Sequence, residues 1–443
     1  MRLERLKPLL TSGAASIAVG MAGTNLIRIV STLVLTRLLD PSAYGVAGIL
    51  MSVATAMALL TDIGTGPFIV RHKEGDDQQF RDAIWTLRLV RSIALTLATA
   101  MLAAPIAQFM EKPFIAPVLT VFSLIFLIDG VSSLGFATAI RERQLWRLSM
   151  LDLATVAVQL LAAIPLAWFW PSYWVIPITM LAGAGFKAAM SYPVFPGAGR
   201  RLRMDRVRAV ELWEFARFIA PSSLLTLLIM QADKVFLARV MSLSDFGHYS
   251  IAVTLAAVPA AAAHPYAFRV LFPAYSQAVH AGGDALRRIF YAKRRKIALL
   301  YMFLTGGFIG GAPFAIELLY DDRYREVTPI LQVLLVSSAL ALVNWSADQA
   351  LMALGKLRAT LLANVVRVAW LIVAGVGGYL ALGSWGLILA LGGMEVAGMA
   401  CYWISLSRNG LLRLGEEALG FAAIGLGFAV AIPLNALLLM LLR

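Results

Sequence analysis

Apolar runs of about 20 residues recur from one end of the chain to the other, and they constrain the fold more than any other feature. A helix of that length crosses the roughly 30 Å hydrocarbon core of a bilayer. We therefore predict an all-α integral membrane protein with twelve transmembrane helices and one extra C-terminal helix. The predicted spans are residues 14–36, 45–67, 87–109, 116–139, 150–170, 173–192, 213–238, 247–268, 297–318, 328–352, 360–381, 385–406 and 419–442.

The composition excludes several classes of protein. With 60% apolar and only 14% charged residues, the chain is not an ordinary soluble domain. The single cysteine, Cys401, excludes an intrachain disulfide and a thiolate metal cage, and the four histidines show no metal-ligand spacing, so we expect no cofactor. The start, MRLERLKPLL, resembles a signal peptide, but the helical pattern continues to Arg37 and favours an uncleaved first span.

Two stretches repeat one pattern, LVLTRLLDPSAYGVAGILMSV at 33–53 and VFLARVMSLSDFGHYSIAV at 235–253. In both, an apolar helix ends in an arginine (Arg37 or Arg239), a short polar turn follows, and an aromatic–glycine pair opens the next apolar run. Other short matches recur downstream at a slowly drifting offset. Such drift is typical of two diverged halves with small insertions, so we predict an internal duplication.

The repeat offset covers six predicted crossings, so both halves should have the same orientation and be related by an axis along the membrane normal. We predict two six-helix parallel repeats, an N-terminal lobe at 1–195 and a C-terminal lobe at 213–407. The Pro/Gly-rich and then basic stretch 196–212 is the predicted cytoplasmic linker, and 408–443 is an extra C-terminal membrane segment. This geometry favours a substrate site between the lobes and alternating access.

Most of the 38 lysine and arginine residues fall on alternate sides of the predicted spans, which places the N-terminus in the cytoplasm. The net charge of +13 is then a topology signal and not a nucleic-acid footprint. The predicted outer loops, such as 170–174 and 382–386, are too short to hold an enzyme domain. The longest cytoplasmic links contain no phosphate-binding loop, which argues against ATP hydrolysis. We predict a transporter and not an enzyme.

Ionisable residues inside membrane spans are costly and usually face a bundle interior or a wet cavity, so they are the candidate site residues. At 1.5 Å per residue, five of them fall near the middle of the bilayer, namely Arg28, Asp129, Lys187, Arg367 and Glu395. Four others fall nearer the ends of their spans, namely Arg217, Asp233, Lys234 and Asp348. Asn25 shares a helical face with Arg28.

Each of these residues also has a purely structural interpretation, which the sequence leaves open. Arg217 and Lys187 could extend to an interface, and Asp129 or Glu395 could be the partner of a buried arginine. Asp233 and Lys234 could lock the end of their span. Arg28 lies too deep to reach an interface easily, which favours a place in a lumen.

The stretches TRLLDPSAYGVAGIL at 36–50 and PFIVRHKEGDDQQFRDAIWT at 67–86 resemble the bacterial polysaccharide flippases, the O-antigen and exopolysaccharide branch of the MOP exporter superfamily. QADKVFLARVMSLSDFGHYSIA at 231–252 is similar to a further signature of that family. The positions that match the family motifs are Arg37, Gly45, Asp233, Lys234, Gly247 and Tyr249. The resemblance covers about residues 1–407, and the extra C-terminal segment departs from it.

The resemblance implies two six-helix lobes in a V, in the bacterial inner membrane, that move an undecaprenyl-pyrophosphate-linked oligosaccharide between leaflets. A polysaccharide polymerase and a chain-length regulator are the implied partners. A pyrophosphate needs fixed positive charge, which Arg28, Lys187, Arg367 and Arg217 could supply beside Asn25. Asp129, Glu395 and Asp348 are the candidates for coupling to an ion.

Two related functions remain as alternatives. A multidrug or organic-cation antiporter of the same superfamily should have a lumen dominated by carboxylates, whereas the mid-depth set has three cations and two anions. A peptidoglycan lipid II flippase shares the architecture but is expected to have fourteen spans. A membrane polymerase or ligase would need a large outer loop, which the sequence lacks.

Overall fold

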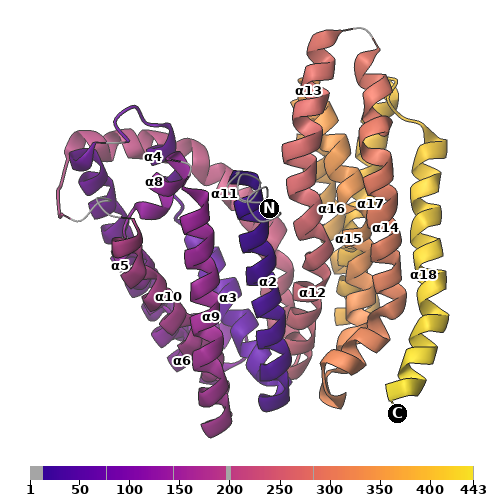
Figure 1. Cartoon of the computed structure of the whole chain (residues 1–443). Coiled ribbons are helices and arrows are strands. Elements are labelled where there is room, and N and C mark those ends of the chain that lie inside the picture. Colours follow the sequence, from indigo (N-terminus) through magenta and orange to yellow (C-terminus); the bar gives the residue numbers. More distant parts are fainter. Residues whose placement is uncertain (1–12, 76, 143, 196–200, 283, 443) are drawn as a thin grey trace, which may run out of the picture. The chain divides into compact units, whose positions relative to one another are not determined.

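The computed structural model describes most of the chain, namely residues 13–75, 77–142, 144–195, 201–282 and 284–442. Every regular element among these residues is a helix, so the predicted all-α class is confirmed (Figure 1). Eleven of the described helices are long and apolar enough to cross a membrane, and each overlaps a predicted span. The two remaining predicted spans, 14–36 and 213–238, lie within the helices α2 (Gly13–Leu38) and α11 (Arg206–Val240).

The chain forms two compact units, Met1–Ser244 (unit 1) and Asp245–Arg443 (unit 2). Helix α11, which the predicted limits assign to the second lobe, packs against α3 (Pro41–Leu60) within unit 1. The lobe limits predicted from the sequence, and the V-shaped arrangement of two parallel repeats, stay predictions.

Unit 1 contains the helices up to α11. Beyond α2 and α3 these are α4 (Thr65–Arg71), α5 (Gln78–Phe109), η1 (Pro113–Ile115), α6 (Ala116–Phe122), α7 (Leu124–Val131), α8 (Gly135–Arg141), α9 (Leu145–Phe169) and α10 (Val175–Val194). Local chemistry sets several starts. Pro41 occupies the first turn of α3, where its missing N–H costs nothing, and the Asp77 carboxylate caps α5 by accepting from the N–H of Phe80.

The predicted span 116–139 is not one continuous helix. Helix α7 ends at Val131 and α8 begins at Gly135, so the backbone leaves the helical path at Ser132–Leu134. The cause is local hydrogen bonding, since both serine side chains at the break have backbone or side-chain partners that compete with the helical ladder. Non-helical backbone at membrane depth is tolerated only where protein or a wet cavity satisfies its polar groups.

The second half of the predicted linker 196–212 is also ordered differently from expectation. Residues 196–200 lie outside the described part of the chain, but α11 already begins at Arg206, where the Asp205 carboxylate accepts from the N–H of Val207. Just before it, the N–H of Arg203 donates to the Thr86 hydroxyl on α5 at 2.9 Å. The basic stretch is thus attached to unit 1.

The far end of α11 is held by a buried lysine. Lys112 follows α5 and donates from its ammonium to the carbonyl oxygens of Ala238 (2.7 Å) and Met241 (3.1 Å). A cation is favoured beside the last carbonyls of a helix, because these carry the negative end of the helix dipole. Burial nevertheless lowers the pKa of the Lys112 amine. Next to this contact Gly45 packs so closely on Leu243 that a Cβ would lie 2.1 Å from the Leu243 carbonyl oxygen.

Unit 2 contains the remaining helices. They are α12 (Leu243–Tyr266, which begins two residues earlier, at the end of unit 1), the π-helix η2 (Ala267–Leu271), α13 (Phe272–Ala281), α14 (Ala285–Leu319), η3 (Asp322–Tyr324), α15 (Val327–Ala353), α16 (Leu357–Leu382), α17 (Ser384–Arg408) and α18 (Leu414–Leu442). The link predicted at 269–296 is therefore mostly helical. Its two helices extend past the ends of the predicted spans 247–268 and 297–318.

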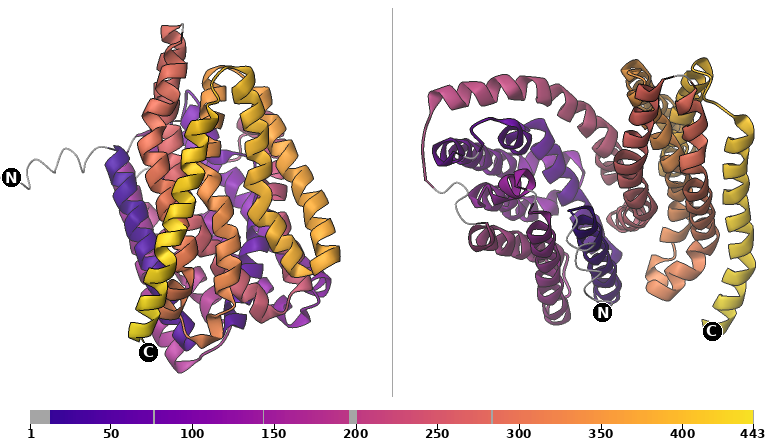
Figure 2. Two further views of the ribbon diagram at one scale, coloured as in Figure 1. Left: turned by 90° about the vertical axis from the view of Figure 1, so that its right-hand side faces the viewer. Right: turned by 45° about the horizontal axis from the view of Figure 1, so that its top comes forward.

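The extra C-terminal segment is a full helix, α18, which lies beside α14 within unit 2 (Figures 1 and 2). The helix continues through Pro433. Glycines allow the two backbones to approach: a Cβ on Gly306 would lie 2.2 Å from the carbonyl oxygen of Ile424, and one on Gly427 would lie 2.0 Å from that of Phe303. Close backbone packing through small residues is a common way for membrane helices to associate.

Polar contacts secure α18 at both ends. Near its start, Glu417 forms an ion pair with Arg294 of α14, and both side chains are buried. Tyr291 also donates to Glu417 at 2.8 Å. Near the other end, the side chain of Asn435 accepts from the N–H of Phe314, directly after the proline that interrupts α14 at Pro313.

Candidate functional site

The ionisable residues predicted inside the membrane lie in two sets of polar contacts, one in each unit. The first includes Asp129 and Lys187 in unit 1, and the second includes Arg367, Glu395 and Asp348 in unit 2. Each set lies within helices that are otherwise apolar. We describe each set within its own unit.

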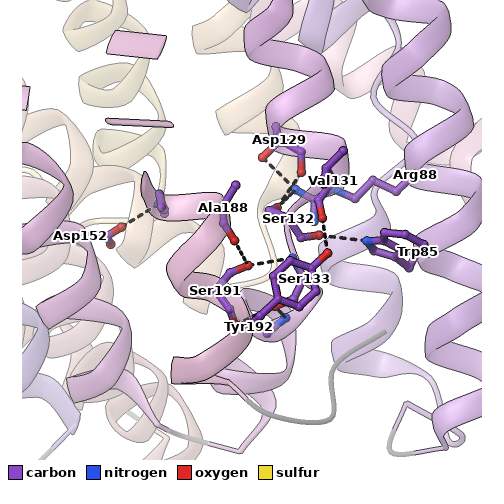
Figure 3. A network of polar contacts seen from close by, with 12 residues as sticks. Trp85, Arg88, Asp129, Val131, Ser132, Ser133, Asp152, Ala188, Ser191 and Tyr192 are labelled. Atoms are coloured by element: carbon purple, nitrogen blue, oxygen red, sulfur yellow. Dashed lines mark hydrogen bonds and ion pairs between the residues drawn. The ribbon is translucent and has the colours of Figure 1, made fainter. Parts of the chain in front are cut away.

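In unit 1, Asp129 forms an ion pair with Arg88 of α5, with 2.8 Å between the carboxylate and guanidinium atoms (Figure 3). The side chain of Arg88 is 12% exposed and that of Asp129 is 64% exposed. Arg88 also donates to the hydroxyl of Ser132, at the point where α7 ends. A guanidinium at this place balances both the carboxylate and the negative end of α7.

The break after α7 is held by side chains from two neighbouring helices (Figure 3). The indole N–H of Trp85 donates to the carbonyl oxygen of Ser132 at 3.0 Å. On the other side, Ser133 and Ser191 of α10 exchange two hydrogen bonds of 2.9 Å, and the hydroxyl of Tyr192 donates to the carbonyl oxygen of Val131. The irregular backbone is therefore satisfied without solvent.

Lys187 of α10 is also paired. Its ammonium lies 2.7 Å from a carboxylate oxygen of Asp152 on α9, and 4.9 Å from the ring centroid of Phe136. Both charged side chains remain about one third to two fifths exposed, at 36% and 42%. A pair with this much exposure contributes little to stability and can separate at low cost.

In unit 2, Arg367 of α16 and Glu395 of α17 form an ion pair with 2.7 Å between nitrogen and oxygen. Asn344 of α15 donates to the same carboxylate at 2.6 Å, and Asn364 accepts from the guanidinium at 3.0 Å. Arg367 is 7% exposed. The positive charge predicted for a lumen is here neutralised by the carboxylate predicted for ion coupling.

Asp348 lies on α15 one helical turn after Asn344. Its carboxylate accepts hydrogen bonds from the hydroxyls of Thr360 (2.6 Å) and Tyr402 (3.2 Å). Neutral donors stabilise a carboxylate without cancelling its charge. Asp348 thus differs from Asp129 and Glu395, each of which is paired with an arginine.

Arg28 is exposed on α2 and forms no ion pair among the described residues. Of the predicted cations whose side chains the structure describes, it is therefore the one without a neighbouring carboxylate. The predicted partner on the same face, Asn25, and the predicted cation Arg217 have side chains outside the described part of the structure.

The residues of the family motifs lie at the ends of helices. Arg37 is in the last turn of α2, and Gly45 is in the first turns of α3. Asp233 and Lys234 are half-buried near the end of α11. In α12, Gly247 is buried and Tyr249 is 1% exposed, with its ring 5.9 Å from that of Phe246. These positions suit packing and not solute binding.

Sequence reasoning missed several members of these networks. Arg88 was assigned to a cytoplasmic loop, although it lies in α5 and pairs with Asp129. Asp152 and Asn364 were not singled out, and neither was Trp85. The one available signal was the run of polar residues Asp129, Ser132 and Ser133 in an apolar span. No sequence pattern could have paired these residues with helices more than 40 positions away.

Within the described residues, no group of three or more His, Cys, Asp or Glu side chains could hold a metal ion. Eleven membrane-length helices with paired charges inside them define a polytopic helical membrane protein with the architecture of a transporter.

Comparisons with known proteins make this class specific. Residues 34–329 match the family model described as "Polysaccharide biosynthesis protein", so the chain belongs to that family. The resemblance found in the sequence is thereby confirmed.

Two curated relatives support the same placement. The chain is 23% identical to the lipopolysaccharide biosynthesis protein WzxC of Escherichia coli over 82% of its length and 74% of that protein's. It is 21% identical to the succinoglycan biosynthesis transport protein ExoT of Rhizobium meliloti, over 72% of its length and 64% of that protein's.

Solved structures share the fold at low identity. The lipid II flippase MurJ in an inward closed conformation has a TM-score of 0.74 at 10% identity, over 96% of this chain and 97% of that one. An inward-facing MATE family transporter of the MOP superfamily has a TM-score of 0.66 at 15% identity, over 89% and 95%. At these identities the likeness shows the fold alone.

Proposed function

We propose that the protein translocates undecaprenyl-pyrophosphate-linked oligosaccharide repeat units across the bacterial inner membrane for surface or exopolysaccharide biosynthesis. The observation that carries this proposal is the family match over residues 34–329. The relative ExoT, named a transport protein of succinoglycan biosynthesis, and the fold shared with a lipid II flippase support it. The protein acts as a transporter and catalyses no covalent step.

The proposed mechanism is alternating access through a cationic lumen. Arg28 is the first candidate for the pyrophosphate, because its guanidinium is exposed and has no carboxylate partner among the described residues. Arginine binds phosphate oxygens through two parallel N–H donors. Lys187 can contribute after leaving Asp152, since that pair is partly exposed. Arg217 and Asn25 complete the proposed set.

Arg367 has a different role in this proposal. Its guanidinium is buried and engaged by Glu395, so it holds α16 to α17 and contacts substrate only if the pair opens. For ion coupling, Asp348 is the strongest candidate of the three carboxylates. It has neutral hydrogen-bond donors, whereas Asp129 and Glu395 are each compensated by an arginine.

The alternatives are a multidrug or organic-cation antiporter and a peptidoglycan lipid II flippase, and the shared fold is compatible with both. We favour the polysaccharide precursor because the family match and both curated relatives are named for polysaccharide biosynthesis. The proposed orientation has the N-terminus in the cytoplasm, and the proposed partners are a polysaccharide polymerase and a chain-length regulator.

The test is to delete the gene and measure which leaflet holds the lipid-linked oligosaccharide. We expect accumulation in the inner leaflet, rescued by the wild type and poorly by Arg28→Ala. Arg325→Ala, which removes an exposed arginine paired with Asp322, is the matched control and should rescue fully. Full rescue by Arg28→Ala would remove Arg28 from the site, and a normal distribution after deletion would reject the proposed function.

A further inference from the structure

An aromatic and imidazole pair on unit 2 has no part in the polar networks described above. His264 of α12 and Trp345 of α15 meet edge to face, with ring centroids 4.9 Å apart and planes at 84°. His264 is exposed and Trp345 is half-buried. Trp345 packs on one side against the small side chains of Ala263, Ala267 and Ala298.

Both rings have polar groups that the protein does not use. Among the described residues, neither the imidazole of His264 nor the indole N–H of Trp345 forms a hydrogen bond. By contrast, the indole N–H of Trp370 in the same unit donates to the carbonyl oxygen of Ala390, and that of Trp85 donates to Ser132. Indole N–H groups in apolar surroundings usually find a partner, so the free group at Trp345 is available to a ligand.

The depth of the pair indicates that this surface is wet. Trp345 lies eight residues before the end of α15 at Ala353, or about 12 Å along the helix axis. His264 contacts it and therefore lies at a similar depth. An ionisable side chain exposed to lipid at that depth is costly, so the surface that carries His264 faces water or a polar solute.

The backbone beside the pair is irregular. Pro265 follows His264 directly, and the π-helix Ala267–Leu271 begins two residues later. Single π-helical turns are rare and often occur at functional sites. Phe268 within this turn is 53% exposed and stacks on Phe272 with centroids 6.1 Å apart, so it extends the aromatic surface along the same helix.

Aromatic rings combined with free hydrogen-bonding groups match the chemistry of a carbohydrate. The C–H groups on one side of a pyranose ring carry partial positive charge and are attracted to the electron-rich face of an aromatic ring, while its hydroxyls need donors and acceptors. Small-ligand sites in general join apolar and aromatic walls with a few placed polar groups.

We propose that His264 and Trp345 form a contact site for a sugar ring of the transported lipid-linked oligosaccharide. This inference rests on the proposed function and assigns the recognition of the sugar to unit 2, separately from the pyrophosphate. Trp345 supplies the aromatic surface and an indole donor, and His264 supplies a second hydrogen-bonding group.

The test uses the full chain in nanodiscs and three probes: undecaprenyl pyrophosphate, and the same lipid carrying one galactose or one N-acetylglucosamine. Equilibrium binding is measured for the wild type, Trp345→Ala, Trp345→Phe and His264→Ala. Trp370→Ala is the matched control, since it removes a tryptophan of the same unit whose N–H is already used. Thermal unfolding of each variant reports on folding.

We expect the wild type to bind at least one sugar-bearing lipid roughly tenfold more tightly than the bare lipid. Trp345→Ala and His264→Ala should reduce this preference while leaving the affinity for the bare lipid unchanged, and Trp345→Phe should keep part of it. Trp370→Ala should keep all of it. Two outcomes would overturn the sugar site: a wild type that binds all three lipids equally, or a Trp345→Ala variant that weakens all three equally. A wild type that binds none would reject the proposed function itself.

Discussion

Asp129 and Arg88 form an ion pair of 2.8 Å where α7 ends inside a membrane span. The guanidinium of Arg88 is mostly buried and also contacts Ser132 at the helix break, so it connects α5 to the irregular backbone. Removing one partner of such a pair leaves a buried charge without compensation, which costs more than the pair contributes.

We therefore predict that Asp129→Asn reduces transport roughly tenfold in the leaflet assay. The double variant Arg88→Asp with Asp129→Arg should recover part of the loss, because it restores a pair of opposite charges. The control is Asp322→Asn, which breaks an exposed pair with Arg325 and should leave transport unchanged. Equal loss in both carboxylate variants would contradict a specific role for the pair.

The pair between Arg367 and Glu395 leads to a prediction about stability. Glu395→Gln leaves the buried guanidinium of Arg367 without its carboxylate, and we expect the free energy of unfolding to fall by about 3 kcal/mol. The double variant Arg367→Met with Glu395→Met should lose less, because no uncompensated charge remains. Thermal unfolding of the purified protein in detergent measures both. A double variant less stable than Glu395→Gln would show that the polar network itself stabilises unit 2.

The contact between α14 and α18 predicts an effect of glycine substitution that depends on position. Gly306→Ala should lower the midpoint of thermal unfolding, because the new Cβ would lie 2.2 Å from the carbonyl oxygen of Ile424 and must separate the helices. Gly311→Ala, on the same helix, meets no atom within 4 Å and should raise or preserve stability. A similar loss for both substitutions would mean that α18 does not pack tightly on α14.

Lys112 predicts a pH dependence. Because burial lowers the pKa of its amine, the folded state releases the proton at a lower pH than the unfolded chain, whose lysine titrates near 10.4. Between these two pKa values the unfolded state binds more protons, so the free energy of unfolding rises with pH. Lys112→Met lacks this contribution and also leaves the carbonyls of Ala238 and Met241 without their donor.

Chemical denaturation of the wild type and Lys112→Met at several pH values measures this effect. At neutral pH we expect the variant to be less stable by about 1–3 kcal/mol. The difference between the two proteins should stay constant at low pH and then grow in favour of the wild type as the pH rises toward 10. A difference that shrinks over that range would contradict a lowered pKa for Lys112.

Part of the site could be anticipated from the sequence, because an ionisable residue in an apolar run is conspicuous wherever it folds. Asp129, Lys187, Arg367, Glu395 and Asp348 were found in this way, and the structure places each of them in a polar contact. Their partners could not be anticipated. Arg88 looked like a loop residue, and His264 was one of four scattered histidines.

The sequence by itself determined that this protein is an all-helical membrane protein of a polysaccharide biosynthesis family, since apolar run length and short motifs are local properties that survive any packing. The tertiary structure decided which charges are neutralised and which stay available. Arg28 and Arg367 look alike in sequence, yet only Arg367 lies against a carboxylate, 28 positions away along the chain. That distinction depends on how separate helices pack, which no local pattern encodes.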